Sequence, residues 1–177
     1  MEILGIAGSL RRESFNRKLL EAARYELPDE LAWRTWDRLA EVPPFNEEAE
    51  QGPVPPSVAS LRAAIAAADR VLIATPEYNG SVPGQLKNAI DWASRPYGES
   101  VLNGKRIAVI GTSPNRYGAA WAQADLRRVL SVAGADVVDA ELPVPEAPRQ
   151  FDEHGRLLDH ELRAGLGKLL DLLRGDR

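Results

Sequence analysis

The sequence predicts an α/β fold in which helices cover both faces of a parallel β-sheet. Short apolar runs alternate along the chain with longer segments in which apolar residues recur at helical spacing. Several of these runs are apolar throughout, which is typical of strands that are buried on both faces. Strands separated by helices in this order form βαβ units, whose crossover connections are right-handed.

Five segments are expected to be strands. Residues 3–7, 71–74 and 106–111 are short apolar runs with the pattern of buried strands. Residues 31–36 alternate apolar and polar side chains, as a half-exposed edge strand does. Residues 136–140 are the last predicted strand.

Helices are expected between and after these strands. In the first of them, Phe15, Leu19 and Ala23 recur at helical spacing, and the final one has an amphipathic pattern. The segment 37–56 is rich in proline and glutamate and is predicted to be a long loop. The expected helices are residues 14–26, 57–68, 84–94, 118–133 and 157–173.

The order of these elements suits a flavodoxin-like three-layer sandwich. Its five-stranded parallel sheet has the order 2-1-3-4-5, and ligands bind at the carboxyl ends of the strands, near the point where the strand order reverses. The length of 177 residues fits one domain, so residues 1–177 are expected to form a single domain.

Composition excludes several kinds of chemistry. The 22 basic and 26 acidic residues give a net charge of −4, so we expect neither nucleic acid nor a membrane as a partner. There is no cysteine, which excludes disulfides, thiolate nucleophiles and iron–sulfur clusters, and no metal site is predicted. No signal peptide or membrane span is expected, and the expected location is the cytoplasm. Redox chemistry would need a borrowed cofactor.

The first candidate loop, residues 8–16, joins a predicted strand to a helix. Backbone N–H groups and the positive end of a helix dipole meet there, Ser9, Ser14 and Asn16 add neutral donors, and Arg11 adds charge. The loop is neither GxGxxG nor a P-loop, which favours the phosphate of a mononucleotide. The alternative is an ordinary strand-to-helix turn with Ser14 as the N-cap.

The second candidate loop, residues 75–84, follows the next buried strand. Tyr78 offers a flat aromatic surface, Asn79-Gly80 favours a tight turn, and two prolines limit the freedom of the loop. Such a loop suits a planar ring such as isoalloxazine. The alternative is a proline-stiffened connection with an exposed tyrosine.

The third candidate loop, residues 111–118, follows the next strand, so the three loops should converge on one cleft. Small residues here would let a ring system approach the backbone, and the alternative is an ordinary loop before a helix.

In the helix after the second loop, Trp92 lies off the core face, which predicts either a subunit contact or a partly covered surface residue. Lys87 and Asp91 are expected to form a solvated i,i+4 pair.

The chain resembles the NADPH-dependent FMN reductase family, which includes chromate and quinone reductases. The resemblance covers essentially the whole chain. Its matching stretches are Gly8–Arg11 with Ser14 and Asn16, residues 76–84 continuing through 86–92, Pro145-Glu146 and residues 151–157.

The resemblance implies non-covalent FMN, with NADPH or NADH as co-substrate. It also implies that Ser9, Arg11, Ser14 and Asn16 bind the phosphate, that residues 76–80 hold the ring, and that the protein is a homodimer or homotetramer. The sequence departs from the family in the third loop, where Asn115-Arg116-Tyr117 replaces a more glycine-rich segment. The candidate cofactor-binding residues are Ser9, Arg11, Ser14, Phe15, Asn16, Pro76, Glu77, Tyr78, Asn79, Gly80, Ser113, Arg116 and Tyr117.

The expected function is hydride transfer from NAD(P)H through FMN to a small acceptor such as a quinone, an azo compound, chromate or free flavin. No catalytic side chain is assigned, because the hydride chemistry belongs to the cofactor. One alternative is a flavodoxin-like electron carrier that does not use NAD(P)H directly. A hydrolase using Ser9 or Ser113 is the other, although neither serine lies in GxSxG.

Overall fold

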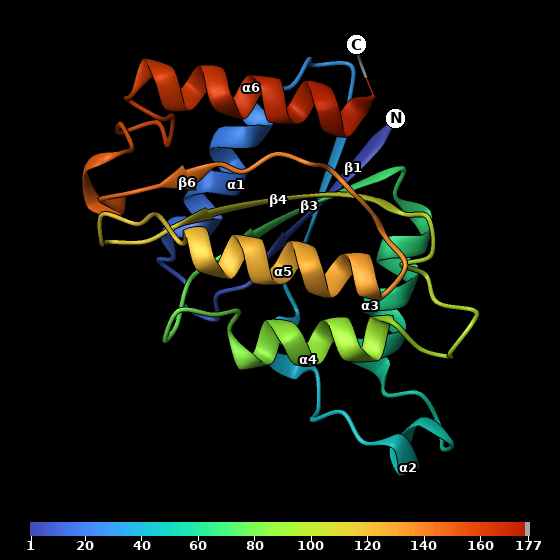
Figure 1. Ribbon diagram of the computed structural model, residues 1–177. Coiled ribbons are helices and arrows are strands. Elements are labelled where there is room, and N and C mark those ends of the chain that lie inside the picture. Colours follow the sequence, from blue (N-terminus) through green and yellow to red (C-terminus); the bar gives the residue numbers. More distant parts are fainter. Residues whose placement is uncertain (176–177) are drawn as a thin grey trace.

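A parallel sheet runs through the centre of the protein (Figure 1). The computed structural model describes residues 1–175. The sheet has the order β2-β1-β3-β4-β5, and every strand pair in it is parallel. The predicted order 2-1-3-4-5 is therefore confirmed. The strands are β1 (Glu2–Ala7), β2 (Ala32–Trp36), β3 (Arg70–Thr75), β4 (Arg106–Thr112) and β5 (Asp136–Val137).

Helices cover both faces of the sheet and complete the three predicted layers (Figure 1). One face carries α1 (Phe15–Tyr25) and α6 (His160–Arg174). The opposite face carries α3 (Pro56–Ala67), α4 (Gly84–Ala93) and α5 (Ala120–Val132). No helix among residues 1–175 has both the length and the apolar character needed to cross a bilayer.

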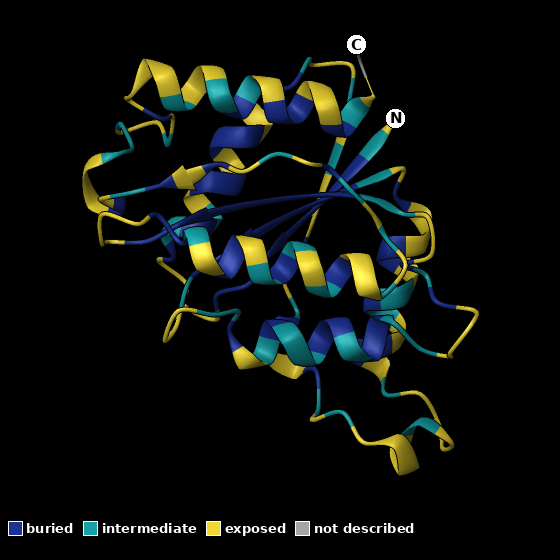
Figure 2. Cartoon of the chain, in the orientation of Figure 1, coloured by how far each residue is buried: buried dark blue, intermediate teal, exposed yellow. Residues whose placement is uncertain are grey.

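The three central strands are buried on both faces, which is why their sequences are apolar without interruption (Figure 2). Successive side chains of β1 enter different cores: Ile3 packs with α1 and α6, and Leu4 packs with α3 and α4. The edge strand β2 is mostly exposed, as its alternating pattern predicts.

The fifth strand differs from the prediction of residues 136–140, which is wrong beyond Val137. The strand β5 ends at Val137, and the chain returns to the sheet only at β6 (Pro143–Val144), which pairs with the end of β4. The buried carboxamide of Gln123 on α5 fills the interruption. It accepts a hydrogen bond from the Leu142 N–H (3.1 Å) and donates to the carbonyl oxygens of Leu142 (3.2 Å) and Gly118 (3.1 Å). The Gln123 side chain thus replaces the backbone hydrogen bonds that a continuous fifth strand would make.

The predicted loop at residues 37–56 contains two short helical segments, η1 (Leu39–Glu41) and α2 (Glu47–Glu50). Asn46 caps α2 by accepting a hydrogen bond from the Glu48 N–H (2.9 Å), and the acidic first turn suits a helix N-terminus.

Trp92 is buried, and both sequence-based interpretations of it are wrong. Its side chain is 1% exposed. The indole Nε1 donates to the Pro43 carbonyl oxygen (2.8 Å), and the Phe45 ring meets the indole edge-on at 5.1 Å between ring centroids. The segment before α2 therefore covers a position that the helical pattern alone places outside the core.

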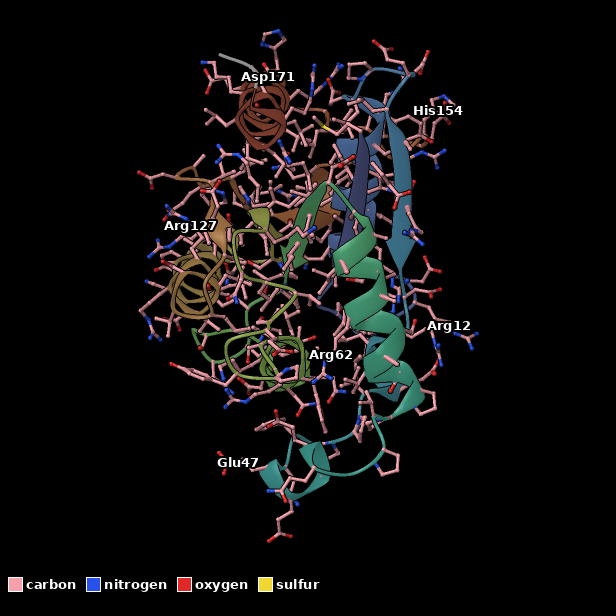
Figure 3. All side chains as sticks on the ribbon, turned by 90° about the vertical axis from the view of Figure 1, so that its right-hand side faces the viewer. Arg12, Glu47, Arg62, Arg127, His154 and Asp171 are labelled. Carbon is pink, nitrogen blue, oxygen red and sulfur yellow. The ribbon has the colours of Figure 1, made fainter. Side chains whose placement is uncertain are left out.

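Arg62 of α3 holds the end of α4. Its guanidinium donates from Nε (3.1 Å) and Nη2 (2.9 Å) to the carbonyl oxygen of Trp92, and Figure 3 shows it between the two helices. Burial lowers the pKa of Arg62. On the surface of α4, the predicted pair of Lys87 and Asp91 is confirmed at 2.7 Å.

The last helix begins at His160, three residues after the predicted start. Asp159 is the N-cap and accepts from the N–H groups of Glu161 and Leu162. The preceding residues form a turn closed by a bridge between Phe151 and Leu157, which the helical pattern does not predict.

Candidate cofactor site

Three loops follow the carboxyl ends of β1, β3 and β4 and lie at one end of the sheet (Figure 1). The first two meet directly, because the Gly8 N–H donates to the Ala74 carbonyl oxygen at 2.8 Å. The first and third are joined by the carboxamide of Asn16. The predicted convergence of these loops is therefore present in the fold.

The first loop has the donors of an anion-binding site. Ser14 is the N-cap of α1, as predicted, and its hydroxyl accepts from the Asn16 N–H at 3.2 Å. Within the described residues, the backbone N–H groups of residues 12–15 make no hydrogen bond, and the first turn of α1 carries no acidic residue. Ser9 and Ser14 are buried beside these groups, and Arg11 is exposed. Unpaired N–H groups, hydroxyls and a cation fit a phosphate monoester.

Asn16 lies under the loop rather than at its surface. Its Nδ2 donates to the Thr112 carbonyl oxygen (3.0 Å), and its Oδ1 accepts from the Thr112 N–H (3.1 Å). This pair of bonds fastens the first loop to the end of β4. Phe15 stacks on Phe151 at 6.4 Å between centroids and 9° between planes, so its ring faces the C-terminal segment.

The second loop is a tight hairpin. Tyr78 and Ser81 exchange two backbone hydrogen bonds of 3.2 Å, and the residues between them have positive φ angles of 53° at Asn79 and 73° at Gly80. These are the features of a two-residue type I′ turn, for which Asn-Gly is the preferred sequence. The predicted turn is confirmed, and it holds Tyr78 half-exposed beside the buried Pro76.

Glu77 and Ser81 attach this hairpin to α5. The Glu77 carboxylate accepts from the Ala122 N–H (3.1 Å) in the first turn of α5, and the Ser81 hydroxyl donates to Asp125 Oδ2 (2.7 Å). Helix α5 has Ala119 as its N-cap and no acidic residue in its first turn. Glu77 therefore supplies, from another loop, the negative charge that stabilises this helix terminus.

The third loop is organised by Asn115, which the sequence analysis named as a departure from the family but not as a site residue. Its Oδ1 accepts from the Ser113 hydroxyl (2.6 Å) and from the Tyr117 N–H (2.9 Å). Gly118, at φ 60°, has no room for a side chain, because a Cβ would lie 2.6 Å from the Val144 nitrogen. The approach of β6 therefore accounts for this glycine.

Three side chains form an exposed cluster beside the hairpin, which we call the aromatic–arginine cluster: Arg116, Tyr117 and Trp121. The rings of Tyr117 and Trp121 are 4.7 Å apart, and the Arg116 guanidinium lies 4.8 Å from the Tyr117 ring and donates to its hydroxyl (2.6 Å). Trp121 is a residue that the sequence analysis did not identify, because it assigned only the range of this helix.

One cavity lies away from these loops, and another borders the first of them. A groove of about 580 Å³ between α4 and α5 contains none of the predicted cofactor-binding residues in its lining. A hollow of about 340 Å³ beside α1 includes Ser14 together with Arg12 and His154. Both labelled side chains, Arg12 and His154, lie on the outer side of the protein in Figure 3. Neither cavity is lined by all three loops, so the cleft predicted between them stays a prediction.

The hydrolase alternative finds no catalytic pair here. The Ser113 hydroxyl donates to Asn115, and the Ser9 hydroxyl accepts from the Arg11 N–H at 3.3 Å. Neither serine is hydrogen-bonded to a histidine within residues 1–175. A serine nucleophile requires such a base.

Comparisons with known proteins identify the family of the chain. Residues 1–149 match the family model of NADPH-dependent FMN reductases. An NAD(P)H-dependent FMN reductase of Pseudomonas aeruginosa is 40% identical over 98% of this chain and 94% of its own length. A 2-hydroxy-1,4-benzoquinone reductase of a Burkholderia species is 37% identical over 97% and 93%. The solved structure of the flavoenzyme FerB of Paracoccus denitrificans, an NAD(P)H:acceptor oxidoreductase, superposes with a TM-score of 0.85 at 34% identity, covering 99% of this chain and 98% of FerB.

The chain belongs to the NADPH-dependent FMN reductase family. It is a flavodoxin-like oxidoreductase that uses FMN and NAD(P)H. A flavodoxin of Pseudomonas aeruginosa shares the fold at 15% identity and a TM-score of 0.63, whereas the relatives at higher identity are reductases.

Proposed function

We propose that this protein reduces quinones with NAD(P)H and that the three loops hold the FMN between them. The balanced reaction is NAD(P)H + H⁺ + quinone → NAD(P)⁺ + hydroquinone. When bound, FMN supplies the two-electron chemistry that no side chain of this protein offers. The observation that carries the proposal is the set of unpaired N–H groups of residues 12–15, at the same end of the sheet as the Asn79-Gly80 turn.

The protein's own residues bind and orient in this proposal. The N–H groups of the first loop and the hydroxyls of Ser9 and Ser14 bind the phosphate, and Arg11 adds a charge-assisted contact. Asn16 positions this loop by holding it to Thr112. Residues 76–80 and Ser113 hold the ring in this proposal. Pre-positioned groups of this kind lower the barrier without acid–base chemistry by a side chain.

Quinones are the proposed acceptors because relatives at 37% and 39% identity are quinone reductases. Azo compounds, chromate and free flavin are further candidate acceptors of the same site.

We also propose that residues 1–177 are one FMN-binding domain and that the protein is a homodimer or homotetramer. Light scattering at micromolar concentration measures the oligomeric state. The cytoplasm is the proposed location, since NAD(P)H is a metabolite of the cell interior.

The first experiment is a visible absorption spectrum. The purified protein is incubated with FMN, desalted and then mixed with NADPH or NADH without oxygen. We expect retained flavin that bleaches on addition of a nicotinamide and recovers its colour when a quinone is added. Flavin that stays oxidised with both nicotinamides would instead support the electron-carrier alternative, and loss of all flavin on desalting would contradict the three-loop site.

Arg11→Ala is expected to weaken FMN binding. Removal of a charge-assisted phosphate contact costs about 1.5–3 kcal/mol, which corresponds to about a 10- to 150-fold higher dissociation constant. Flavin fluorescence titration measures it. Arg24→Ala is the matched control, because Arg24 is also exposed but lies in the last turn of α1, away from the first loop. Equal dissociation constants for Arg11→Ala and the unchanged protein would exclude this role.

A further inference from the structure

The aromatic–arginine cluster is attached to the rim of the candidate site. Trp121 lies in the first turn of α5, next to Ala122, whose N–H is held by Glu77 of the hairpin. Tyr117 is fixed from the other side, because its N–H donates to Asn115 in the third loop. The cluster therefore lies where the second and third loops meet, although its side chains contribute little to the core.

Two properties of the cluster indicate what it would bind. About half of each aromatic side chain is open to solvent, with Tyr117 41% and Trp121 51% exposed, so the uncovered surface is available to a planar molecule. Arg116 is exposed and forms no ion pair with a carboxylate within residues 1–175. A stacked ring with a negative charge would satisfy both the aromatic surface and the unpaired cation.

We infer that Arg116, Tyr117 and Trp121 select planar aromatic acceptors that carry a negative charge, such as hydroxyquinone anions. The acceptor ring stacks on the Trp121 indole beside Tyr117, and its oxyanion accepts a hydrogen bond from Arg116. The inference rests on the proposed function and specifies its substrate class. The two electrons come from NAD(P)H, in the balance NAD(P)H + H⁺ + hydroxyquinone anion → NAD(P)⁺ + hydroquinone anion, so the cluster itself is neither oxidised nor reduced.

The test compares two acceptors of similar size and shape. At neutral pH 2-hydroxy-1,4-naphthoquinone is an anion, and 2-methyl-1,4-naphthoquinone is neutral. We expect Arg116→Gln to raise the KM of the anionic quinone about tenfold, the effect of one charge-assisted hydrogen bond, and to change that of the neutral quinone less than about twofold. Trp121→Leu should raise both KM values, because both quinones lose the stacking surface.

A binding measurement is independent of turnover. Calorimetric titration of the FMN-loaded, oxidised protein with 2-hydroxy-1,4-naphthoquinone, without NAD(P)H, should show weaker binding for Arg116→Gln. The charge-matched control is Arg128→Gln, since Arg128 is an exposed arginine of α5 that lines the groove between α4 and α5. Because all substituted side chains are exposed, unchanged circular dichroism is expected for each variant.

The outcomes separate the inference from the proposed function. An equal effect of Arg116→Gln on both quinones, or an effect on the KM of NADPH alone, would overturn the inference while leaving quinone reduction intact. Binding of the anionic quinone that depends on Arg116, with no turnover of either quinone, would support the cluster as a binding site and overturn the proposed function.

Discussion

Trp92→Ala is expected to lower the free energy of unfolding by about 3–5 kcal/mol, the range for removing a large buried aromatic side chain. Its indole is 1% exposed and contacts Phe45 edge-on. The lost packing dominates this cost, because the Pro43 carbonyl oxygen that accepts from Trp92 also accepts from Asn88 Nδ2 at 2.9 Å. Chemical denaturation followed by circular dichroism measures the change.

Trp121→Ala is the control for this prediction. Trp121 is half-exposed on α5, so its removal should cost less than about 1 kcal/mol. Trp92→Phe should fall between the two, since it keeps an aromatic ring in the core. A Trp92→Ala protein with unchanged stability but a smaller mass in solution would restore the interpretation of Trp92 as a subunit contact.

Gln123→Ala is expected to cost about 3–5 kcal/mol. The substitution leaves the N–H and carbonyl groups of Leu142 and the carbonyl group of Gly118 without the partner described above, and each buried unpaired group costs about 1–3 kcal/mol. The damage should be local at first, so amide hydrogen exchange around β6 should accelerate more than exchange in β3. Denaturation curves give the total cost.

The matched control is Gln51→Ala, because Gln51 is an exposed residue at the end of α2. Its substitution should change stability by less than about 0.5 kcal/mol. If Gln123→Ala had an equally small effect, water or a shifted backbone would have to satisfy Leu142, and the interrupted strand would not depend on this side chain.

The layers of the fold were predictable because they depend on local patterns. An uninterrupted apolar run such as that of β3 has one stable place, inside a sheet covered on both faces. Ser14 before an amphipathic segment marks the start of α1 through its own side chain, and Asn79-Gly80 specifies its turn by backbone preference. These signals lie within a few residues of the structure that they determine.

The features that were missed depend on contacts between distant segments. Trp92 is covered by Pro43, 49 residues earlier in the chain, and helical periodicity contains no information about such a cover. The cap of α5 comes from Glu77, 45 residues before Ala122. One clue existed, because α5 has no capping side chain of its own at Ala119.

The two bonds between Asn16 and Thr112 have a consequence for the thermodynamics of cofactor uptake. They join the start of α1 to the end of β4 through buried groups, so the protein's own hydrogen bonds order the end of the first loop. A loop that is ordered before binding does not lose conformational entropy when the ligand arrives, and this part of the binding free energy is retained as affinity. Tight retention of FMN through desalting would thus owe as much to a residue beneath the loop as to the groups that contact the phosphate.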